Sequence, residues 1–351
     1  TETPESRLLV VSIMAGSVVI AGCLQLTWSL IALRGKAHLR LDLAAAASPL
    51  RDIIRRAGPM ILGLGVLQIN TLFDGLIASY PLLFGDTIAG HPYPLSDQAM
   101  ATISFAQRLY QFPLGVFGIA VATAIYPLLA KQGGDTATFS DTVRRGIRFV
   151  LFIGLPAGIG LMVVREPITK IILQGGEFSA QDTSRVAFVL LGYAASVWAY
   201  ALVQVLTRAF YARDEVTTPV RIAVAVVGLN VVLNVTLIWT PLREAGLAWS
   251  TSICAAIQAI VMLWILQRRG LSLRGDGVPR AVMQIVVLTA IMALSVWAAD
   301  RMLGDSTEWW PSLIKLLVLI SIGGAVYILG AMAMRMRELR WILGHGSNSA
   351  E

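Results

Sequence analysis

Residues 105–130 read FAQRLYQFPLGVFGIAVATAIYPLLA, and Arg108 is the one charged side chain in this run. With the residues before it, the run forms a candidate membrane span over 99–130, since about 20 apolar residues cross a bilayer. A charge at this depth is unfavourable, so such side chains usually face a cavity or a partner. Pro113, five residues later, removes one helical hydrogen bond. The stretch therefore predicts a membrane helix that is broken close to an arginine.

The composition of the whole chain is typical of a membrane protein. Of its 351 residues, 56% are hydrophobic and 14% are charged, whereas about a quarter of the residues in soluble domains are charged. We therefore expect an all-α, polytopic membrane helix bundle. It would have nine spans, at 8–33, 59–84, 99–130, 146–164, 186–210, 219–240, 245–267, 281–300 and 311–334.

The charges of the connecting loops alternate along the chain. Residues 34–56 contain six Lys or Arg, whereas residues 85–98 contain none, and basic loops recur at every second connection. By the positive-inside rule, residue 1 lies outside and the C-terminus lies in the cytoplasm. The net charge of +7 is then explained by membrane sidedness, so no nucleic-acid partner is expected.

Two short basic segments, 48–56 and 139–149, have amphipathic patterns. They predict helices on the cytoplasmic surface, where anionic lipid headgroups attract arginines. The alternative is that each simply extends the span that follows it.

Gln107 and Gln111 flank Arg108 and can form hydrogen bonds with it without neutralising its charge. A broken helix beside a buried cation is typical of transport sites, and a guanidinium that is not neutralised favours an anionic group such as a phosphate. We therefore predict a substrate-binding site at Arg108, Gln107 and Gln111. The alternative is an arginine paired with an acid elsewhere in the bundle.

Side chains with oxygen donors recur inside three other segments: Asp74 after Asn70, Asn230 before Asn234, and the neighbours Ser250 and Thr251. Asn230 and Asn234 are four residues apart and share one helix face. Carboxylate, amide and hydroxyl oxygens suit a small, hard cation. The alternative is ordinary hydrogen bonding between membrane helices.

No motif for catalysis stands out. The three histidines lie in loops and the tail, and no HExxH, GxSxG or P-loop sequence occurs. The two cysteines lie in apolar runs and indicate neither a disulfide scaffold nor a metal centre. We therefore expect a protein that is not an enzyme and has no cofactor other than a cation such as Na⁺.

Several stretches, taken in order, resemble the MurJ/MviN lipid II flippase family of the multidrug, oligosaccharidyl-lipid and polysaccharide exporter superfamily. They are GPMILGLGVLQINTLFDGLIASY (58–80), the opening stretch (105–130), ILQGGEFSAQDT (172–183), RAFYARDEVTTPVRIA (208–223), LNVVLN (229–234) and EAGLAWSTS (244–252). The family has fourteen spans, and nine spans that start outside match its sixth to fourteenth. The resemblance therefore implies that the first five spans are missing.

The resemblance also implies a function. The protein would move the lipid-linked peptidoglycan precursor, lipid II, from the inner to the outer leaflet of the bacterial cytoplasmic membrane. It would do so as a monomer, by alternating access around a cationic cavity, in contact with membrane lipids. Arg108 would bind the pyrophosphate. Gln107 and Gln111 stand where the family often has acids, which argues against a role of these positions in proton coupling.

The same resemblance implies a division of the chain and a cation site. Residues 1–47 would end an N-terminal lobe, 48–267 would form the core of the C-terminal lobe, and 268–351 would hold the last two spans, a groove for the lipid tail and a cytoplasmic tail. Some members of the family bind sodium at positions that match Asp74, Asn230, Asn234 and a hydroxyl at or next to Thr251. We take Thr251 as that ligand, with Ser250 as the alternative.

Other functions fit the same pattern of spans. The chain could export a different polyprenyl-linked oligosaccharide, act as a multidrug or cation antiporter, or be a membrane-embedded partner without transport of its own. A multidrug pump would favour acids in its cavity, whereas this chain offers Arg108.

Overall fold

The computed structural model describes residues 4–34, 65, 68–115, 126, 129, 136–272, 277–304 and 308–342. The chain forms two units, Thr1–Arg56 and Ala57–Glu351, and each is considered by itself. In the first unit, α1 (Pro4–Leu33) is a helix of 30 residues. At 1.5 Å per residue it is about 45 Å long, which is enough to cross a bilayer.

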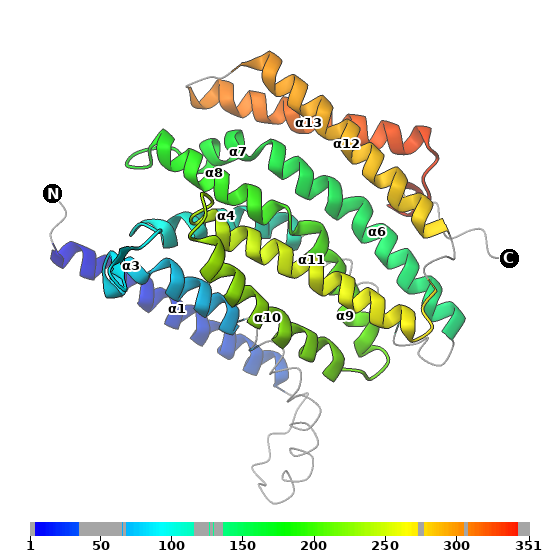
Figure 1. Ribbon diagram of the computed structural model, residues 1–351, viewed down its shortest axis with the longest axis horizontal. Coiled ribbons are helices and arrows are strands. Elements are labelled where there is room, and N and C mark those ends of the chain that lie inside the picture. Colours follow the sequence, from blue (N-terminus) through cyan, green and yellow to red (C-terminus); the bar gives the residue numbers. More distant parts are fainter. Residues whose placement is uncertain are drawn as a thin grey trace, which may run out of the picture. The chain divides into compact units, whose positions relative to one another are not determined.

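The second unit is built almost entirely of helices (Figure 1). Residues 68–78 are helical and lead into a short helix and a two-residue hairpin. The elements are α3 (Tyr80–Phe84), β1 (Thr87–Ile88), β2 (His91–Pro92), α4 (Ala99–Pro113), α6 (Thr136–Val163), α7 (Arg165–Leu173), α8 (Ala180–Ala194), α9 (Val197–Tyr211), α10 (Thr217–Leu237), α11 (Ala245–Arg268), α12 (Val278–Leu303), α13 (Trp309–Ala333) and α14 (Arg337–Ile342). The strands pair antiparallel, with Thr87 opposite Pro92.

The prediction of an all-α membrane bundle is confirmed. Within the described residues, seven helical stretches are long and apolar enough to span a membrane, at Ala15–Leu33, Ala137–Val163, Ala180–Tyr211, Thr217–Leu237, Ala245–Arg268, Val278–Leu303 and Trp309–Ala333. The two other predicted spans, 59–84 and 99–130, lie partly outside the described residues. The count of nine therefore stays a prediction.

The segment predicted as 186–210 differs in detail from that prediction. It comprises α8 and α9, which are separated by a turn at residues 195–196. The buried Ser196 hydroxyl donates to the carbonyl of Tyr193 at 2.6 Å in this turn. A polar side chain that is satisfied by its own backbone lets the chain bend here without leaving an unpaired group in an apolar environment.

The prediction of a separate surface helix at 139–149 is wrong. These residues are the first turns of α6, as the alternative held. Phe139, Val143, Ile147 and Val150 are buried in one cluster with residues of α9 such as Leu206. This apolar face continues along α6, so nothing in the sequence separates the basic segment from the span. The other segment, 48–56, lies outside the described residues.

The helices of the second unit pack in successive layers (Figure 1). α12 and α13 lie side by side, and α12 packs on α6, which in turn packs on α9. α8 and α9 also contact α11, which pairs with α10. Three apolar clusters hold these layers together, and the third joins α6 to α12 and α13 through Phe152, Ile285, Leu288 and Leu319.

Gly158 marks the closest approach between α6 and the α8–α9 turn. A methyl group at this position would lie 2.8 Å from the carbonyl oxygen of Ala194 and 3.3 Å from Cβ of Val197. Because a backbone carbonyl cannot move aside easily, we expect Gly158→Ala to lower the free energy of unfolding by about 1–3 kcal/mol. Thermal unfolding in detergent measures the change.

Gly160→Ala is the matched control for this prediction. It lies on the same helix, but a methyl group there would meet only the flexible tip of Met292, at 3.8 Å. We expect its melting temperature to stay close to that of the wild type. Equal melting temperatures for the two variants would contradict the close contact at Gly158.

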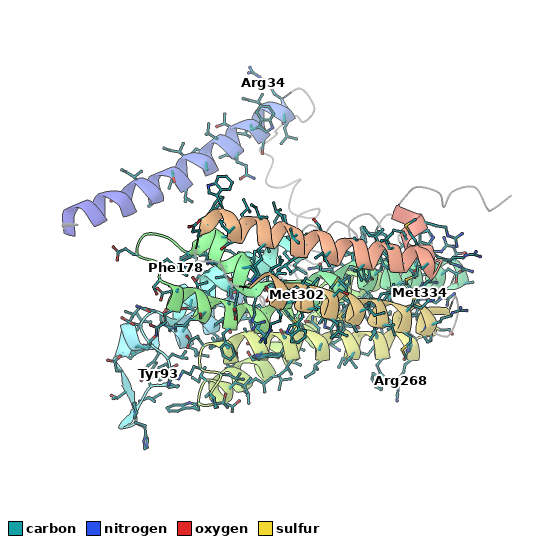
Figure 2. The ribbon with its side chains drawn as sticks, turned by 90° about the horizontal axis from the view of Figure 1, so that it is seen from above. Arg34, Tyr93, Phe178, Arg268, Met302 and Met334 are labelled. Carbon is teal, nitrogen blue, oxygen red and sulfur yellow. The ribbon has the colours of Figure 1, made fainter. Side chains whose placement is uncertain are left out.

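The two ends of the second unit carry different charges. One end holds the β1–β2 hairpin, α7 and the α10–α11 turn, and we call it the hairpin end. At the other end α9 leads into α10 and α11 ends, and we call it the arginine end. Figure 2 shows Tyr93 and Phe178 at the first and Arg268 and Met334 at the second. The arginine end carries Arg145, Arg208, Arg213, Arg221, Arg268 and Arg269, which outnumber the acids Asp141, Asp214 and Glu215 there, whereas the hairpin end has no such excess of bases among its described residues.

Candidate functional site

A buried polar network joins the helix at residues 68–78 to α10. The Asn234 amide donates to Oδ1 of Asp74 at 2.5 Å and to Oδ1 of Asn230 at 2.9 Å. Asn70, one turn before Asp74, donates to its other carboxylate oxygen at 3.3 Å. Asp74, Asn230 and Asn234 are at most 6% exposed. The structure therefore brings together the three residues that the sequence singled out.

The hydroxyl that joins this network belongs to Ser250 of α11. Ser250 Oγ donates to Oδ1 of Asn234, and the Asn230 amide approaches Ser250 Oγ at 3.4 Å. Both Ser250 Oγ and Thr251 Oγ1 donate at 2.8 Å to the carbonyl of Leu247 in their own helix, but Ser250 Oγ is the one that also donates to α10. Neighbouring residues of a helix point about 100° apart, so only one of the two can face α10. In this structure Ser250, the alternative, joins the network, whereas the binding of a cation by either hydroxyl stays a prediction.

In this structure the Asn234 amide group donates hydrogen bonds to the Asp74 carboxylate and to the Asn230 side-chain oxygen. If the Asn234 amide turned over, its oxygen would replace its nitrogen beside Asp74 and Asn230, and oxygens would gather around one point. Such a group of hard donors suits a small cation such as Na⁺. In the described part of the chain no three His, Cys, Asp or Glu side chains group as a metal centre.

Arg108 lies on the exposed side of α4. Its neighbours Gln111 and Phe112 are exposed as well, and Phe112 keeps 75% of its surface accessible. Among the residues that the structure describes, no carboxylate pairs with Arg108. The alternative of an arginine paired with an acid is therefore not what this part of the structure shows.

The opposite side of α4 anchors the helix. Tyr110 is buried and its ring stacks on Tyr193 of α8, with the ring centroids 4.9 Å apart and the planes 5° from parallel. The Gln107 amide donates to the Tyr193 hydroxyl at 3.0 Å. Gln107 therefore positions α4 against α8, whereas Gln111 and Arg108 remain on the open side. The three residues predicted to contact the substrate therefore do not lie in one environment.

Near Arg108 the α-helix changes to a wider helical turn at the position of Pro113, and the predicted break beyond it lies outside the described residues. α4 ends at Pro113, and residues 114–115 continue in a wider, π-type turn. The amide of Leu114 reaches back only to the carbonyl of Gln111. An irregular turn of this kind leaves backbone carbonyls exposed, which membrane proteins tolerate where the chain lines a cavity or is covered by protein.

Sequence reasoning missed the tyrosine pair. Tyr110 lies two residues after Arg108, and Tyr193 falls in a run that otherwise reads as plain apolar helix. The only signal was that both are amphipathic aromatics inside spans, where a buried hydroxyl needs a partner. Gln107 supplies that partner, and this is a structural use of a residue that looked like a ligand contact.

Comparisons with known proteins bear on the whole chain. A family model described as lipid II flippase MurJ matches residues 3–319. A protein of Vibrio cholerae named probable lipid II flippase MurJ is 32% identical over 297 residues, covering 80% of this chain and 52% of that protein. One of Rhizobium tropici with the same name is 29% identical over 324 residues, covering 91% of this chain and 58% of that protein. The chain thus spans about half the length of the curated relatives it matches.

A solved structure, described as lipid II flippase MurJ in an inward closed conformation, superposes with a TM-score of 0.68. The match covers 88% of this chain and 59% of that one at 21% sequence identity, and it shows that the two share a fold.

Proposed function

The chain belongs to the lipid II flippase MurJ family, and from this premise we propose that it moves lipid II from the inner to the outer leaflet of a bacterial cytoplasmic membrane. Lipid II combines an apolar polyprenyl tail with a pyrophosphate and a polar sugar-peptide head. Its transfer therefore requires a polar path beside the hydrocarbon core, with cations to receive the pyrophosphate.

The observation that carries this proposal is the placement of Arg108. Its helix is fixed from behind by the Tyr110–Tyr193 stack, and no carboxylate of the described residues neutralises its guanidinium. A guanidinium can bind two phosphate oxygens at once through parallel N–H groups. We propose that Arg108 holds the lipid II pyrophosphate and that Gln111, on the same open side, contacts the neighbouring headgroup.

The motion that we propose is alternating access. The lipid would enter a cavity from one leaflet, and a change of conformation would open that cavity to the other. Binding can drive such a change only if Arg108 holds the pyrophosphate more tightly in one state than in the other.

The orientation that we propose follows from the charges. Arginines outnumber acids at the arginine end, whereas the described residues of the hairpin end show no excess of bases. By the positive-inside rule the arginine end faces the cytoplasm, and so does the C-terminus beyond α14.

Depletion of the encoding gene tests the function. We expect lipid II to accumulate in the inner leaflet while its synthesis continues, and accessibility to an external lipid II-degrading enzyme measures how much reaches the outer leaflet. Normal export in depleted cells would overturn the proposal. It would favour another polyprenyl-linked cargo or a partner without transport.

We further propose that Asp74, Asn230, Asn234 and Ser250 bind Na⁺. A cation that binds only the folded protein stabilises it, by about 2.7 kcal/mol at one hundred times its dissociation constant. Wild-type protein should therefore melt at a higher temperature in NaCl than in KCl, and Asp74→Asn should remove that difference.

Asp97→Asn is the control, because Asp97 is an exposed carboxylate at the hairpin end. It should keep the stabilisation by sodium. A wild-type protein that melts at the same temperature in both salts would reduce the network to hydrogen bonding between helices.

A further inference from the structure

A cavity of about 550 Å³ opens at the hairpin end, away from the network around Asp74 and away from Arg108. Residues of α6, α7 and α12 line it, together with Leu191 of α8. One part of its wall is apolar, formed by Ile159, Met162 and Val163. The other part is charged. The two parts together are complementary to an amphiphile, a molecule with an apolar portion and a charged headgroup.

Two arginines supply the positive charge of this cavity. Arg165 donates to the carbonyl of Met162 at 2.9 Å, which leaves further N–H groups of its guanidinium, and its side chain is 32% exposed. Arg301 is exposed, and its guanidinium lies over the Trp297 ring, 5.3 Å from the centroid. The ring orients the arginine without neutralising it. Both guanidinium groups can therefore bind a phosphate.

Two acids line the same cavity, but they differ in their partners. Asp300 pairs with Lys315 of α13 at 2.8 Å, and this ammonium group also donates to the carbonyl of Gly304. Glu166 is 67% exposed, and its nearest cation, Arg165, lies 3.5 Å away. An ion pair this exposed to solvent contributes little to stability. Glu166 is therefore the carboxylate that is available to a ligand.

Tryptophans place the cavity at the depth of lipid headgroups. Trp297 lines it, and Trp309 and Trp310 begin α13, with the Trp309 ring nitrogen donating at 3.1 Å to the carbonyl of Ile171 in α7, the helix that supplies Arg165 and Glu166. Tryptophans of membrane proteins gather at the membrane–water interface. Met302, between the lining residues Arg301 and Gly304 at the end of α12, is 87% exposed (Figure 2). A ligand at this depth reaches the cavity from the lipid.

We propose that this cavity binds the headgroup of a zwitterionic phospholipid that carries an ethanolamine group. Its phosphate would bind Arg165 and Arg301, its ammonium group would bind Glu166, and the first carbons of its chains would follow Ile159, Met162 and Val163. This site takes a resident lipid and does not depend on the flippase function, because it requires only that the chain spans a membrane.

Native mass spectrometry of the delipidated chain in detergent tests the proposal. The probes are phosphatidylethanolamine, phosphatidylglycerol and diacylglycerol, which differ only in the headgroup. Wild-type protein should prefer the lipids in that order. Arg301→Gln and Arg165→Gln should each weaken binding of both phospholipids by about tenfold, whereas Glu166→Gln should weaken binding of phosphatidylethanolamine alone.

Arg243→Gln is the matched control, because Arg243 is an exposed arginine at the same end that does not line this cavity. Its lipid affinities should equal those of the wild type. Retention of the three lipids to the same extent would overturn the proposal, as would an unchanged affinity in Arg301→Gln.

The remaining arms identify the source of the phosphate. Inorganic phosphate should not displace the lipid at millimolar concentration, and displacement would indicate a site for a free anion. Undecaprenyl pyrophosphate should compete no better than phosphatidylglycerol. Stronger competition would overturn the assignment to a phospholipid and would indicate that the cavity binds the transported lipid.

Discussion

Replacing Arg108 with alanine in the chromosomally encoded protein is expected to abolish growth once any other flippase is depleted, while the protein still accumulates in the membrane. The guanidinium would form charge-assisted hydrogen bonds to the pyrophosphate, each contributing about 1.5–3 kcal/mol. Loss of one such bond weakens binding roughly tenfold or more. Lipid II should then collect in the inner leaflet, as measured by its protection from an external degrading enzyme.

Two further variants separate charge from shape. Arg108→Lys keeps the charge but loses the planar fork, so we expect partial export. Arg145→Ala removes an exposed arginine from the arginine end of α6 and should leave export unchanged. Growth of the Arg108→Ala strain at the wild-type rate would remove this residue from the substrate site.

The second large effect concerns a buried ion pair near the arginine end. Arg148 of α6 donates its Nε–H to Glu338 of α14 at 2.6 Å, and the two side chains are 6% and 1% exposed. The Arg148 guanidinium also lies 5.3 Å from the centroid of the Trp341 ring. Arg148→Met would leave the Glu338 carboxylate without this cation in a buried place. We expect the free energy of unfolding to fall by about 3–5 kcal/mol.

A double-mutant cycle completes this prediction. Replacing both partners, as Arg148→Met with Glu338→Leu, should recover most of the lost stability, because no charge then remains buried. Arg145→Met, three residues earlier and exposed, should have little effect. Thermal unfolding in detergent gives the stabilities of the wild type, Arg148→Met, Glu338→Leu and the double variant. A single variant as stable as the wild type would show that α14 does not depend on this pair.

The class of fold could be predicted from the sequence because membrane spans follow from one physical rule. Backbone polar groups in a bilayer must pair internally, so a long apolar run becomes a helix. The rule places spans but not their irregularities. The bend at Ser196 has no proline to announce it, and its nearest glycine, Gly192, lies within α8. The basic turns before 150 join α6 because Val143 and Ile147 continue its apolar face.

The candidate site was predictable in its residues but not in its details. Asp74, Asn230 and Asn234 were found because polar side chains inside spans are rare and need partners. The choice between Ser250 and Thr251 depended on the rotation of α11, which packing against α10 decides. Likewise Gln107 belongs to the anchor because α4 packs on α8 and brings it to Tyr193. The ion pair of Arg148 joins residues 190 positions apart, and no local pattern indicates such a partner.

The most direct test of the account measures whether Arg108 recognises the pyrophosphate. The quantity is the ratio of affinities for undecaprenyl pyrophosphate and undecaprenol, which share a tail and differ only in the charged group. We predict that the wild-type protein prefers the pyrophosphate by about tenfold or more and that Arg108→Ala loses this preference. The same preference in both proteins would contradict the claim that this guanidinium binds the cargo.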